Sequence, residues 1–176
     1  MIIRPARPED GDAVADVRVV SWRATYRGVV PGPYLDTMDA NRAHWRSVAA
    51  GELAGAELLV CEVDGAVVGF ACYGAARPPA FGFGGELYAT YYLPEAMGKG
   101  YGSAMLHAVI GGLKRQGHAD MIVWVMEANA RGRNFYEKIL RMTPVEGSRQ
   151  SFVIGDSTIW EVAYGLRPLP DSAAAR

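Results

Sequence analysis

The sequence predicts one α/β domain of the α+β type, with a mixed, mostly antiparallel sheet of about seven strands and helices on both faces. Segments with strand or helix periodicity follow one another in the order β-α-α-β-β-β-α-β-α-β-β, and no internal repeat or linker divides them. Only the strand–helix–strand unit from Glu86 to Met126 requires a parallel pair, because hairpins are antiparallel. We therefore expect a single domain over residues 1–166. The Pro- and Ala-rich segment 167–176 is expected to be a disordered tail.

Seven apolar or β-branched runs predict the strands. Asp64-Gly65 lies between the second and third runs and predicts a hairpin, because both turn positions need a positive φ. Gly155-Asp156 lies between the last two in the same way. The run at 120–126 is apolar on both faces, which indicates a central strand. The expected strands are residues 2–5, 57–63, 66–74, 86–93, 120–126, 144–154 and 157–166.

Four segments have apolar residues at helical spacing. The first begins near Pro8, which suits a first turn, and Glu9 and Asp10 follow where the helix dipole favours negative charge. The last begins at Asn129, a good N-cap residue. The expected helices run from about Pro8, from about Tyr34 to Ala50 after the Gly/Pro break at 28–33, from the glycines at 98–102 to near Gly117, and from Asn129 to Leu140.

The composition excludes several classes of function. Lys plus Arg (18) nearly balances Asp plus Glu (19), which argues against non-specific binding of nucleic acid. No apolar run approaches the length of about 18 residues that a membrane helix needs, and residues 1–10 lack the apolar core of a secretory signal. Cys61 and Cys72 have neither CxxC spacing nor a histidine cluster. We expect free thiols, no metal site, no membrane partner and a cytoplasmic protein.

The segment from residue 85 to residue 106, GELYATYYLPEAMGKGYGSAML, has glycine at every second position from Gly98 through Gly100 to Gly102. A turn that leads into a helix presents free N–H groups and the positive end of the helix dipole, which together bind phosphate. Glycines without Cβ atoms would let a pyrophosphate approach the main chain. The alternative is a glycine-rich helix start that binds nothing.

Two familiar nucleotide motifs do not fit this loop. A P-loop needs GxxxxGK followed by Ser or Thr, whereas Lys99 is followed by Gly100. A dinucleotide fingerprint needs its glycines directly after the strand and an acidic residue about 20 positions later. Here residues 94–97 intervene, and the first acid after the next strand, Glu127, lies 127 − 98 = 29 residues beyond Gly98.

Two segments together resemble the GNAT superfamily of N-acetyltransferases. Residues 97–102, Met-Gly-Lys-Gly-Tyr-Gly, are similar to that family's Gln/Arg-x-x-Gly-x-Gly/Ala, and Asn129 leads into a helix with Phe-Tyr-Glu-Lys at 135–138. The element order resembles the family over roughly residues 1–166. Two departures are Met97 in place of Gln or Arg, which loses a polar contact, and Ile-Leu-Arg at 139–141 in place of Leu-Gly-Phe, which should change how the helix ends.

The resemblance implies that strands 86–93 and 120–126 splay apart and that acetyl-CoA lies in the gap. It implies main-chain contacts from residues 91–93 and a pyrophosphate site at 97–102. Basic residues at 99, 131, 133 and 138 would meet the phosphates, although a solvated basic face explains them equally well. The implied cofactor-binding residues are Tyr91, Tyr92, Leu93, Met97, Gly98, Lys99, Gly100, Tyr101, Gly102, Asn129 and Lys138.

The resemblance also suggests two catalytic residues. Tyr136 lies seven residues after Asn129, two helical turns along, so both side chains share one helix face, and Tyr136 would be the general acid. Its alternative is an aromatic core residue. Glu86 precedes Met97 by 97 − 86 = 11 residues, the spacing of the general-base glutamate in histone-type members. Its alternative is a solvent-facing strand residue.

The acceptor site is the least determined part. Trp22, Tyr26 and Tyr73 are the expected substrate-binding aromatic residues, although core packing explains them equally well. The sequence predicts an N-acetyltransferase that transfers acetyl from acetyl-CoA to a primary amine of a small molecule, polyamine-like or an amino acid, in a ternary complex. An inactive acyl-CoA-binding module, or an acetyltransferase of protein N-termini or lysines, are the alternatives. A monomer or homodimer is expected. The acidic candidates for holding a cationic amine are Asp36, Asp39, Asp156 and Glu161.

Overall fold

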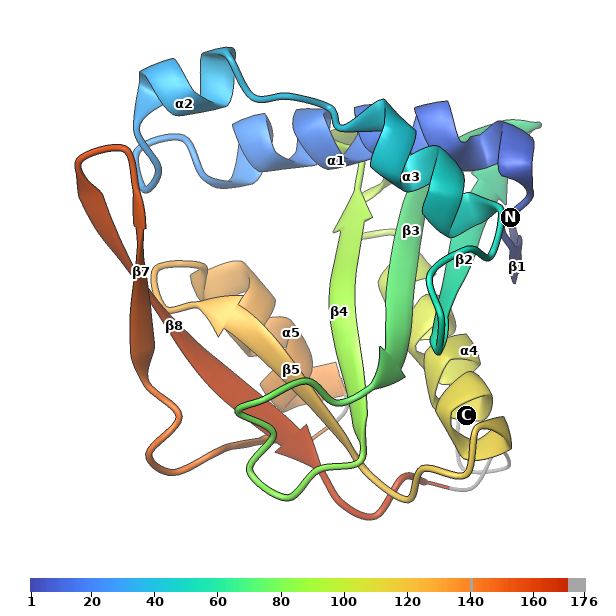
Figure 1. The fold of residues 1–176 in the computed structure, drawn as a ribbon, viewed down its shortest axis with the longest axis vertical. Helices are drawn as coiled ribbons and strands as arrows, with labels where there is room; N and C mark the ends of the chain where they lie inside the picture. Colours follow the sequence, from blue (N-terminus) through green and yellow to red (C-terminus); the bar gives the residue numbers. More distant parts are fainter. Residues whose placement is uncertain (140, 171–176) are drawn as a thin grey trace.

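The computed structural model describes residues 1–139 and 141–170. Within these residues, eight strands form one sheet in the order β1-β2-β3-β4-β5-β8-β6, with β7 paired to β8 (Figure 1). The strands are β1 Ile2–Pro5, β2 Ala56–Val63, β3 Ala66–Ala75, β4 Gly85–Tyr92, β5 Met121–Met126, β6 Thr143–Pro144, β7 Gln150–Ile154 and β8 Ser157–Leu166. The helices are α1 Gly11–Thr25, α2 Gly32–Asp36, α3 Arg42–Ala49, α4 Tyr101–Arg115 and α5 Ala130–Ile139, and 3₁₀ turns lie at Pro8–Asp10 and Pro94–Ala96.

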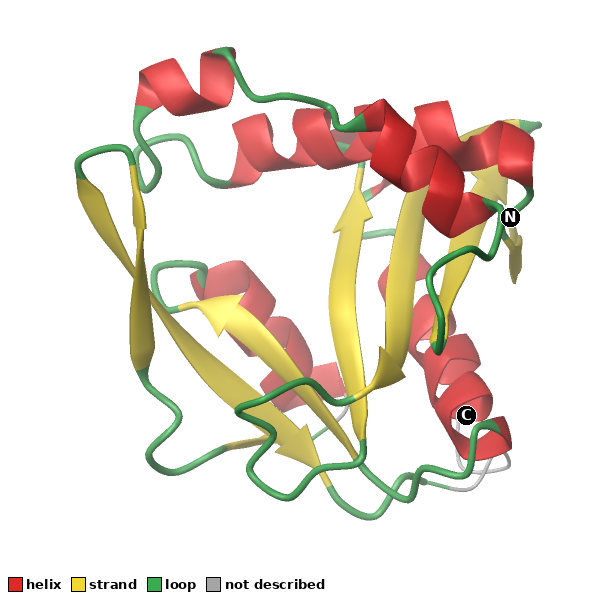
Figure 2. Cartoon of the chain, viewed as in Figure 1, coloured by secondary structure: helices red, strands yellow, loops and turns green. Residues whose placement is uncertain are grey.

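Helices cover both faces of the sheet, as predicted (Figure 2). Alternate residues of β2 and β3 enter two separate hydrophobic clusters, because side chains along a strand point to opposite faces. Leu58, Val60 and Phe70 pack with α1 and α3, whereas Leu59 and Ala71 pack with α4. No helix in the described part of the chain is long and apolar enough to cross a membrane.

The sheet is split between its two central strands. β4 and β5 are parallel, and they pair only through Gly85–Met121, Glu86–Ile122 and Leu87–Val123. Beyond these pairs the two strands diverge, and Figure 1 shows β4 rising toward α1 while β5 runs toward the β7–β8 hairpin. All other strand pairs are antiparallel. The predicted fold class and the splayed pair are therefore confirmed.

The second expected helix, Tyr34 to Ala50, is wrong as one element. The chain forms α2 and α3 with a break between them. Asn41 adopts φ 52°, a left-handed conformation that cannot continue a right-handed helix. The Asp39 carboxylate accepts the N–H of Asn41 at 2.9 Å and so stabilises this turn.

The expected strand at 144–154 is also two elements, which raises the number of strands from about seven to eight. A turn separates β6 from β7, and Gly147 lies there with φ 73°. The Ser148 hydroxyl accepts the N–H of Ala163 on β8 at 3.0 Å, so this turn is bonded to the sheet that it interrupts.

The first residues of the expected tail are packed onto the domain. Leu169 is buried, and its N–H donates to the carbonyl of Ala119 at 2.8 Å. The Arg167 guanidinium pairs with the Asp120 carboxylate at 2.6 Å. The prediction of a disordered tail therefore fails at residues 167–170, and its remainder, 171–176, lies outside the described residues.

Helix α4 approaches β3 very closely at one glycine. The Tyr73 side chain is fully buried beneath α4, and its hydroxyl donates to the Glu57 carboxylate. A Cβ atom placed on Gly112 would lie 1.9 Å from the Tyr73 hydroxyl oxygen. Only a residue without a side chain fits there, so Gly112 sets the distance between α4 and the sheet.

Candidate functional site

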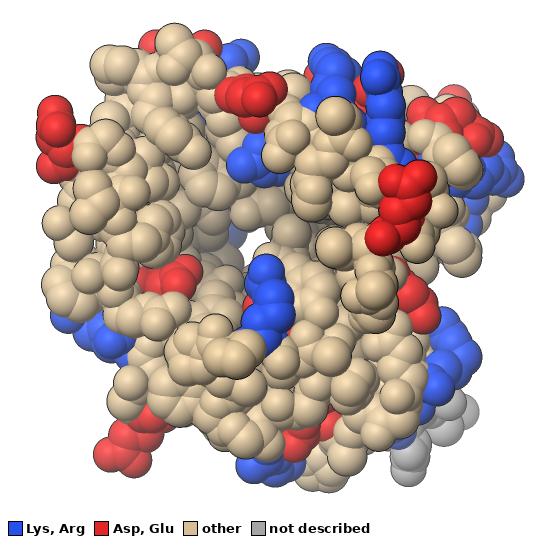
Figure 3. Space-filling model, in the orientation of Figure 1, with Lys and Arg blue, Asp and Glu red and all other residues tan. Residues whose placement is uncertain are grey.

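A cavity of about 570 Å³ opens where β4 and β5 separate. Its walls are residues 87–92 of β4, residues 123–125 of β5, the first turn of α4, one side of α5, Ser21 and Thr25 of α1, and Tyr26 at the end of that helix. The face drawn in Figure 3 is hollowed near its centre, between the β7–β8 hairpin and β4. The split in the sheet therefore creates a large concave site.

The glycine loop forms one end of the cavity. Gly98 and Gly100 have φ 78° and 83°, conformations that favour glycine, and a Cβ on either would meet no atom within 4 Å. Gly100 caps α4, whose first-turn N–H groups have no partner within the helix. Gly102 has a different reason to be glycine, because a Cβ there would lie 3.1 Å from the Phe135 ring of α5.

The loop residues differ in their access to the cavity. Met97 lines it together with Gly98, Gly100 and Gly102, whereas Lys99 and Tyr101 do not. Leu93 is also outside the lining, and its main chain is already bonded, since its N–H donates to Val68 and its carbonyl accepts from Ala96. The expected main-chain contact at Leu93 is therefore not supported, while Tyr91 and Tyr92 both face the cavity.

Helix α5 supplies the opposite wall. Asn129 Oδ1 accepts the N–H of Gly132 at 2.9 Å, which confirms the predicted N-cap. Asn129, Arg131 and Lys138 line the cavity, and Arg133 does not. The position where the family pattern has its glycine, residue 140, lies outside the described residues, and the next residue, Arg141, has φ 52°.

Three tyrosines meet in the cavity: Tyr26, which caps the end of α1, and Tyr136 of α5 are buried, and Tyr91 of β4 is partly buried. Burial raises the pKa of each hydroxyl above its ordinary value, and for Tyr26 the neighbouring Asn129 side chain works in the opposite direction. All three hydroxyls are thus protonated at neutral pH and can donate hydrogen bonds. Sequence reasoning selected Tyr136 as the acid, and the structure brings it together with Asn129 and the glycine loop.

The expected general base, Glu86, does not line the cavity. Its side chain is 3% exposed and both of its oxygens accept N–H groups of Arg77, from the main chain at 2.8 Å and from Nη2 at 2.5 Å. A carboxylate held in this way is not free to take a proton from an amine. The geometry therefore does not support Glu86 as the base.

The expected acceptor residues are only partly assembled. Tyr26 lines the cavity, and Trp22 packs behind it with its ring centroid 4.9 Å from that of Tyr26. Tyr73 was expected to bind the acceptor, but it is buried on the opposite face of the sheet against α4. Sequence reasoning missed Ser21 and Thr25, which lie one helical turn apart on α1 and could have been found by that spacing.

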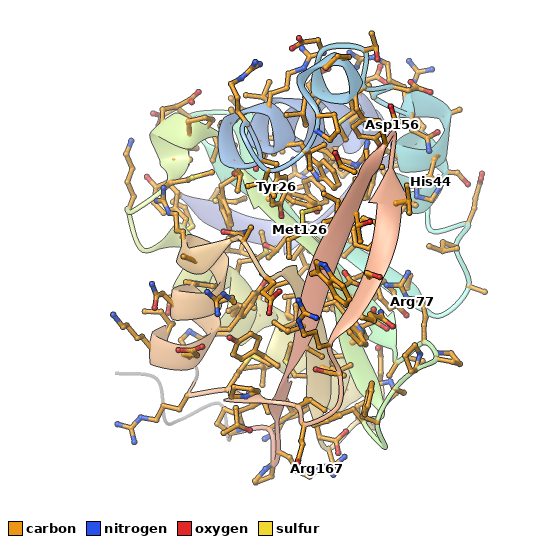
Figure 4. The ribbon with its side chains drawn as sticks, turned by 90° about the vertical axis from the view of Figure 1, so that its left-hand side faces the viewer. Tyr26, His44, Arg77, Met126, Asp156 and Arg167 are labelled. Carbon is orange, nitrogen blue, oxygen red and sulfur yellow. The ribbon has the colours of Figure 1, made fainter. Side chains whose placement is uncertain are left out.

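None of the four acidic candidates is a cavity-lining residue, and the described lining contains no Asp or Glu. Asp36 pairs with Arg27 at 3.3 Å, and Asp39 is occupied by the turn before α3. Asp156 lies at the tip of the β7–β8 hairpin (Figure 4). Glu161 of β8 accepts a hydrogen bond from Gln150 at 2.8 Å.

Metal chemistry has no candidate ligands in the described part of the chain, where no group of three His, Cys, Asp or Glu side chains could hold an ion. Cys61 and Cys72 are both buried free thiols, as predicted.

The glycine-capped helix, the Asn-capped helix and the cavity between two splayed strands match a known family. The model of the acetyltransferase (GNAT) family matches residues 17–140. This chain belongs to the GNAT family of acetyltransferases. It is 32% identical to YuaI of Bacillus subtilis, described as an uncharacterized N-acetyltransferase, over 99% of this chain and 95% of that protein.

Solved structures agree with this assignment. The structure of yncA from Salmonella typhimurium, which contains acetyl-CoA, superposes with a TM-score of 0.71 at 25% identity, covering 100% of this acetyltransferase and 98% of yncA. The paia N-acetyltransferase of Thermoplasma acidophilum, solved with coenzyme A, has the same fold, with a TM-score of 0.69 at 20% identity over 91% of this chain and 96% of that one. The resemblance found in the two sequence motifs is therefore confirmed, and the protein is an acyltransferase.

Proposed function

We propose that this GNAT acetyltransferase transfers acetyl from acetyl-CoA to the primary amine of a small molecule, with both substrates bound together. The observation that carries the proposal is one cavity with a glycine-capped helix start at one end and three protonated tyrosines inside it. Direct transfer fits the lining, because its described residues include no cysteine and no serine paired with a base.

The residues present fit acetyl-CoA. Gly98 and Gly100 leave open space above the first-turn N–H groups of α4, where a pyrophosphate would be held by the main chain. Arg131 and Lys138 are the cations in the lining that would pair with phosphate oxygens. The main chain of Tyr92 faces the unpaired side of β4 and would hold the pantetheine arm, whereas the N–H and carbonyl of Tyr91 point toward β3. When bound, acetyl-CoA supplies an acetyl thioester, whose transfer to an amine leaves a free thiol.

Tyr136 would provide the proton-bearing group at the reacting end. Burial raises its pKa well above the ordinary value for a thiol, about 8.5. Its proton is therefore not given up easily, and the hydroxyl acts chiefly as a hydrogen-bond donor that stabilises negative charge on sulfur. With Glu86 bonded to Arg77, the amine must enter neutral or lose its proton to water.

The test is release of thiol from acetyl-CoA with a panel of polyamines, amino acids, aminoglycosides and peptides. We expect turnover with at least one small amine, and double-reciprocal plots at several amine concentrations that intersect. Parallel lines would contradict direct transfer. Turnover with peptides alone would favour a protein acetyltransferase, and tight binding of acetyl-CoA without turnover on any amine would favour a binding module.

A glycine substitution tests the phosphate cradle. Gly98→Ala should weaken acetyl-CoA binding at least tenfold, because alanine at φ 78° is strained by about 1–2 kcal/mol and shifts the amides of the loop. Gly51→Ala is the matched control, because Gly51 has the same φ, equally open surroundings and a place at the end of α3. Calorimetric titration with acetyl-CoA gives both affinities. Equal affinities for the two variants would show that the loop does not hold the pyrophosphate.

A further inference from the structure

The loop between β3 and β4 carries an arginine, Arg77, that is fixed from two directions. Its Nη2 and Nε donate to the Glu86 carboxylate at 2.5 and 3.3 Å. Its guanidinium carbon lies 4.2 Å from the centroid of the Tyr88 ring. Glu86 is 3% exposed, whereas the Arg77 side chain is 63% exposed. A buried carboxylate and an aromatic face thus hold a guanidinium whose other side is open to solvent.

Tyr88 connects this arginine to the cavity. It is the extra residue of a bulge in β4, since Tyr73 pairs with Leu87 and Cys72 with Ala89. The Tyr88 hydroxyl donates to the carbonyl of Ala75 at 2.6 Å, and its side chain lines the cavity. Figure 4, in which the face of Figure 3 is turned to the right, shows Arg77 on that hollowed side. Arg77 is not itself a lining residue, but its guanidinium lies over the ring of Tyr88, which is, so it lies beside the cavity wall.

The charged side chains of the cavity lining are of one sign. The described lining contains two charged residues, Arg131 and Lys138, both cationic and both on α5. Glu86 is matched by Arg77, so it offers no negative charge to a ligand. A guanidinium has five N–H donors in a planar fork that matches a carboxylate. The bonds to Glu86 use two nitrogens and leave Nη1 free of that carboxylate.

We propose that Arg77 binds an anionic group of the acceptor, and that the acceptor is therefore an amine that also carries a carboxylate, as an amino acid does. This rests on the proposed acetyltransferase function and narrows it, because a polyamine has no such group. Glu86 and Tyr88 are positioning residues that hold the guanidinium beside the cavity wall. The competing candidate is a polycationic acceptor held by Glu161, the acidic residue of β8.

The first experiment compares kcat/KM for thiol release with each amino acid, α- and ω-amino alike, and with its carboxamide, which lacks the negative charge. We expect the wild type to prefer the best acid over its amide at least tenfold. Arg77→Gln should remove this preference by raising KM for the acid. Arg167→Gln is the matched control, since Arg167 is also exposed (53%), pairs with Asp120 and lies 4.4 Å from the Phe83 ring. It should keep the wild-type preference.

Arg77→Gln leaves Glu86 buried without its partner, so the double variant Arg77→Gln, Glu86→Gln is measured as well, with Tm as the test of folding. A second readout does not need turnover: calorimetric titration of the free protein with the N-acetyl derivative of the preferred acid. Binding should be lost in both Arg77 variants and retained in Arg167→Gln.

The proposal would be overturned if the folded Arg77 variants kept the wild-type ratio of kcat/KM for the amino acid to kcat/KM for its carboxamide. It would also be overturned by a wild type that prefers spermidine to every amino acid and loses this preference on Glu161→Gln. In both cases thiol is still released, and the acetyltransferase function stands. Absence of thiol release with every amine would overturn the function and this inference together.

Discussion

Tyr136→Phe should lower kcat about 10²-fold while the dissociation constant of acetyl-CoA changes less than threefold. A hydrogen bond to a charged group contributes about 1.5–3 kcal/mol, and general acids contribute about 10²–10⁴-fold, so the two ranges overlap near 10². The lower end applies because burial raises the pKa of the Tyr136 hydroxyl and disfavours full proton transfer. Phenylalanine keeps the ring that lines the cavity, so the effect belongs to the hydroxyl.

Tyr164→Phe is the matched control for this experiment. Tyr164 is buried, its ring stacks on that of Tyr136 with centroids 6.4 Å apart, and it lies outside the cavity lining. Its hydroxyl donates to Glu137. Steady-state kinetics should show kcat within twofold of the wild type. If Tyr136→Phe has the same kcat as Tyr164→Phe, Tyr136 has no part in the chemistry.

Gly112→Ala should destabilise the fold by about 3 kcal/mol, which lowers Tm by roughly 6–12 °C for a chain of this size. A methyl group there would lie 1.9 Å from the Tyr73 hydroxyl, which is buried and bonded to Glu57. Either α4 moves away from the sheet or Tyr73 loses its hydrogen bond in the core.

A substitution at the neighbouring Gly111 distinguishes the effect of the close packing at Gly112 from the effect of helix propensity. A Cβ on Gly111 would meet only the end of the Arg115 side chain, at 3.5 Å. Gly111→Ala should therefore stabilise the protein by up to about 1 kcal/mol, because alanine is the better helix former. Thermal unfolding followed by circular dichroism measures both variants. Equal shifts in Tm would show that the close approach at Gly112 is unimportant.

The elements that local chemistry determines could be predicted from the sequence. The β2–β3 hairpin is one, since Asp64 and Gly65 both have the positive φ that its turn requires. The helix expected from Tyr34 to Ala50 failed for an instructive reason. The apolar residues at helical spacing in that segment, Leu35, Met38, Trp45 and Val48, are all buried. Their spacing therefore predicted which residues are buried, but not that the helix is interrupted.

The cofactor end of the site could be predicted from the sequence, and the acceptor end could not. The glycine loop and the N-capped α5 are local motifs, so sequence reasoning could place Gly98, Gly100, Asn129 and Tyr136 together. The acceptor side depends on which face of a strand meets which helix, and alternation along β3 does not tell one face from the other. Tyr73 was expected at the acceptor site for that reason, although it packs under α4. The Arg77–Glu86 pair depends on the conformation of the loop between β3 and β4, which no sequence motif predicts.

The three-pair contact between β4 and β5 has a consequence for the lifetime of the protein. Where the strands part, each presents an open hydrogen-bonding edge inside the molecule, in a position that a continuous sheet would close. A bound acetyl-CoA would bridge these edges, and at 100 times its dissociation constant it would add about 2.7 kcal/mol by mass action. Amide hydrogen exchange at Thr90 and Tyr92, whose N–H groups point away from β3, should slow when it binds. Metabolic supply of the cofactor would then govern how long this acetyltransferase survives proteolysis, as well as how fast it works.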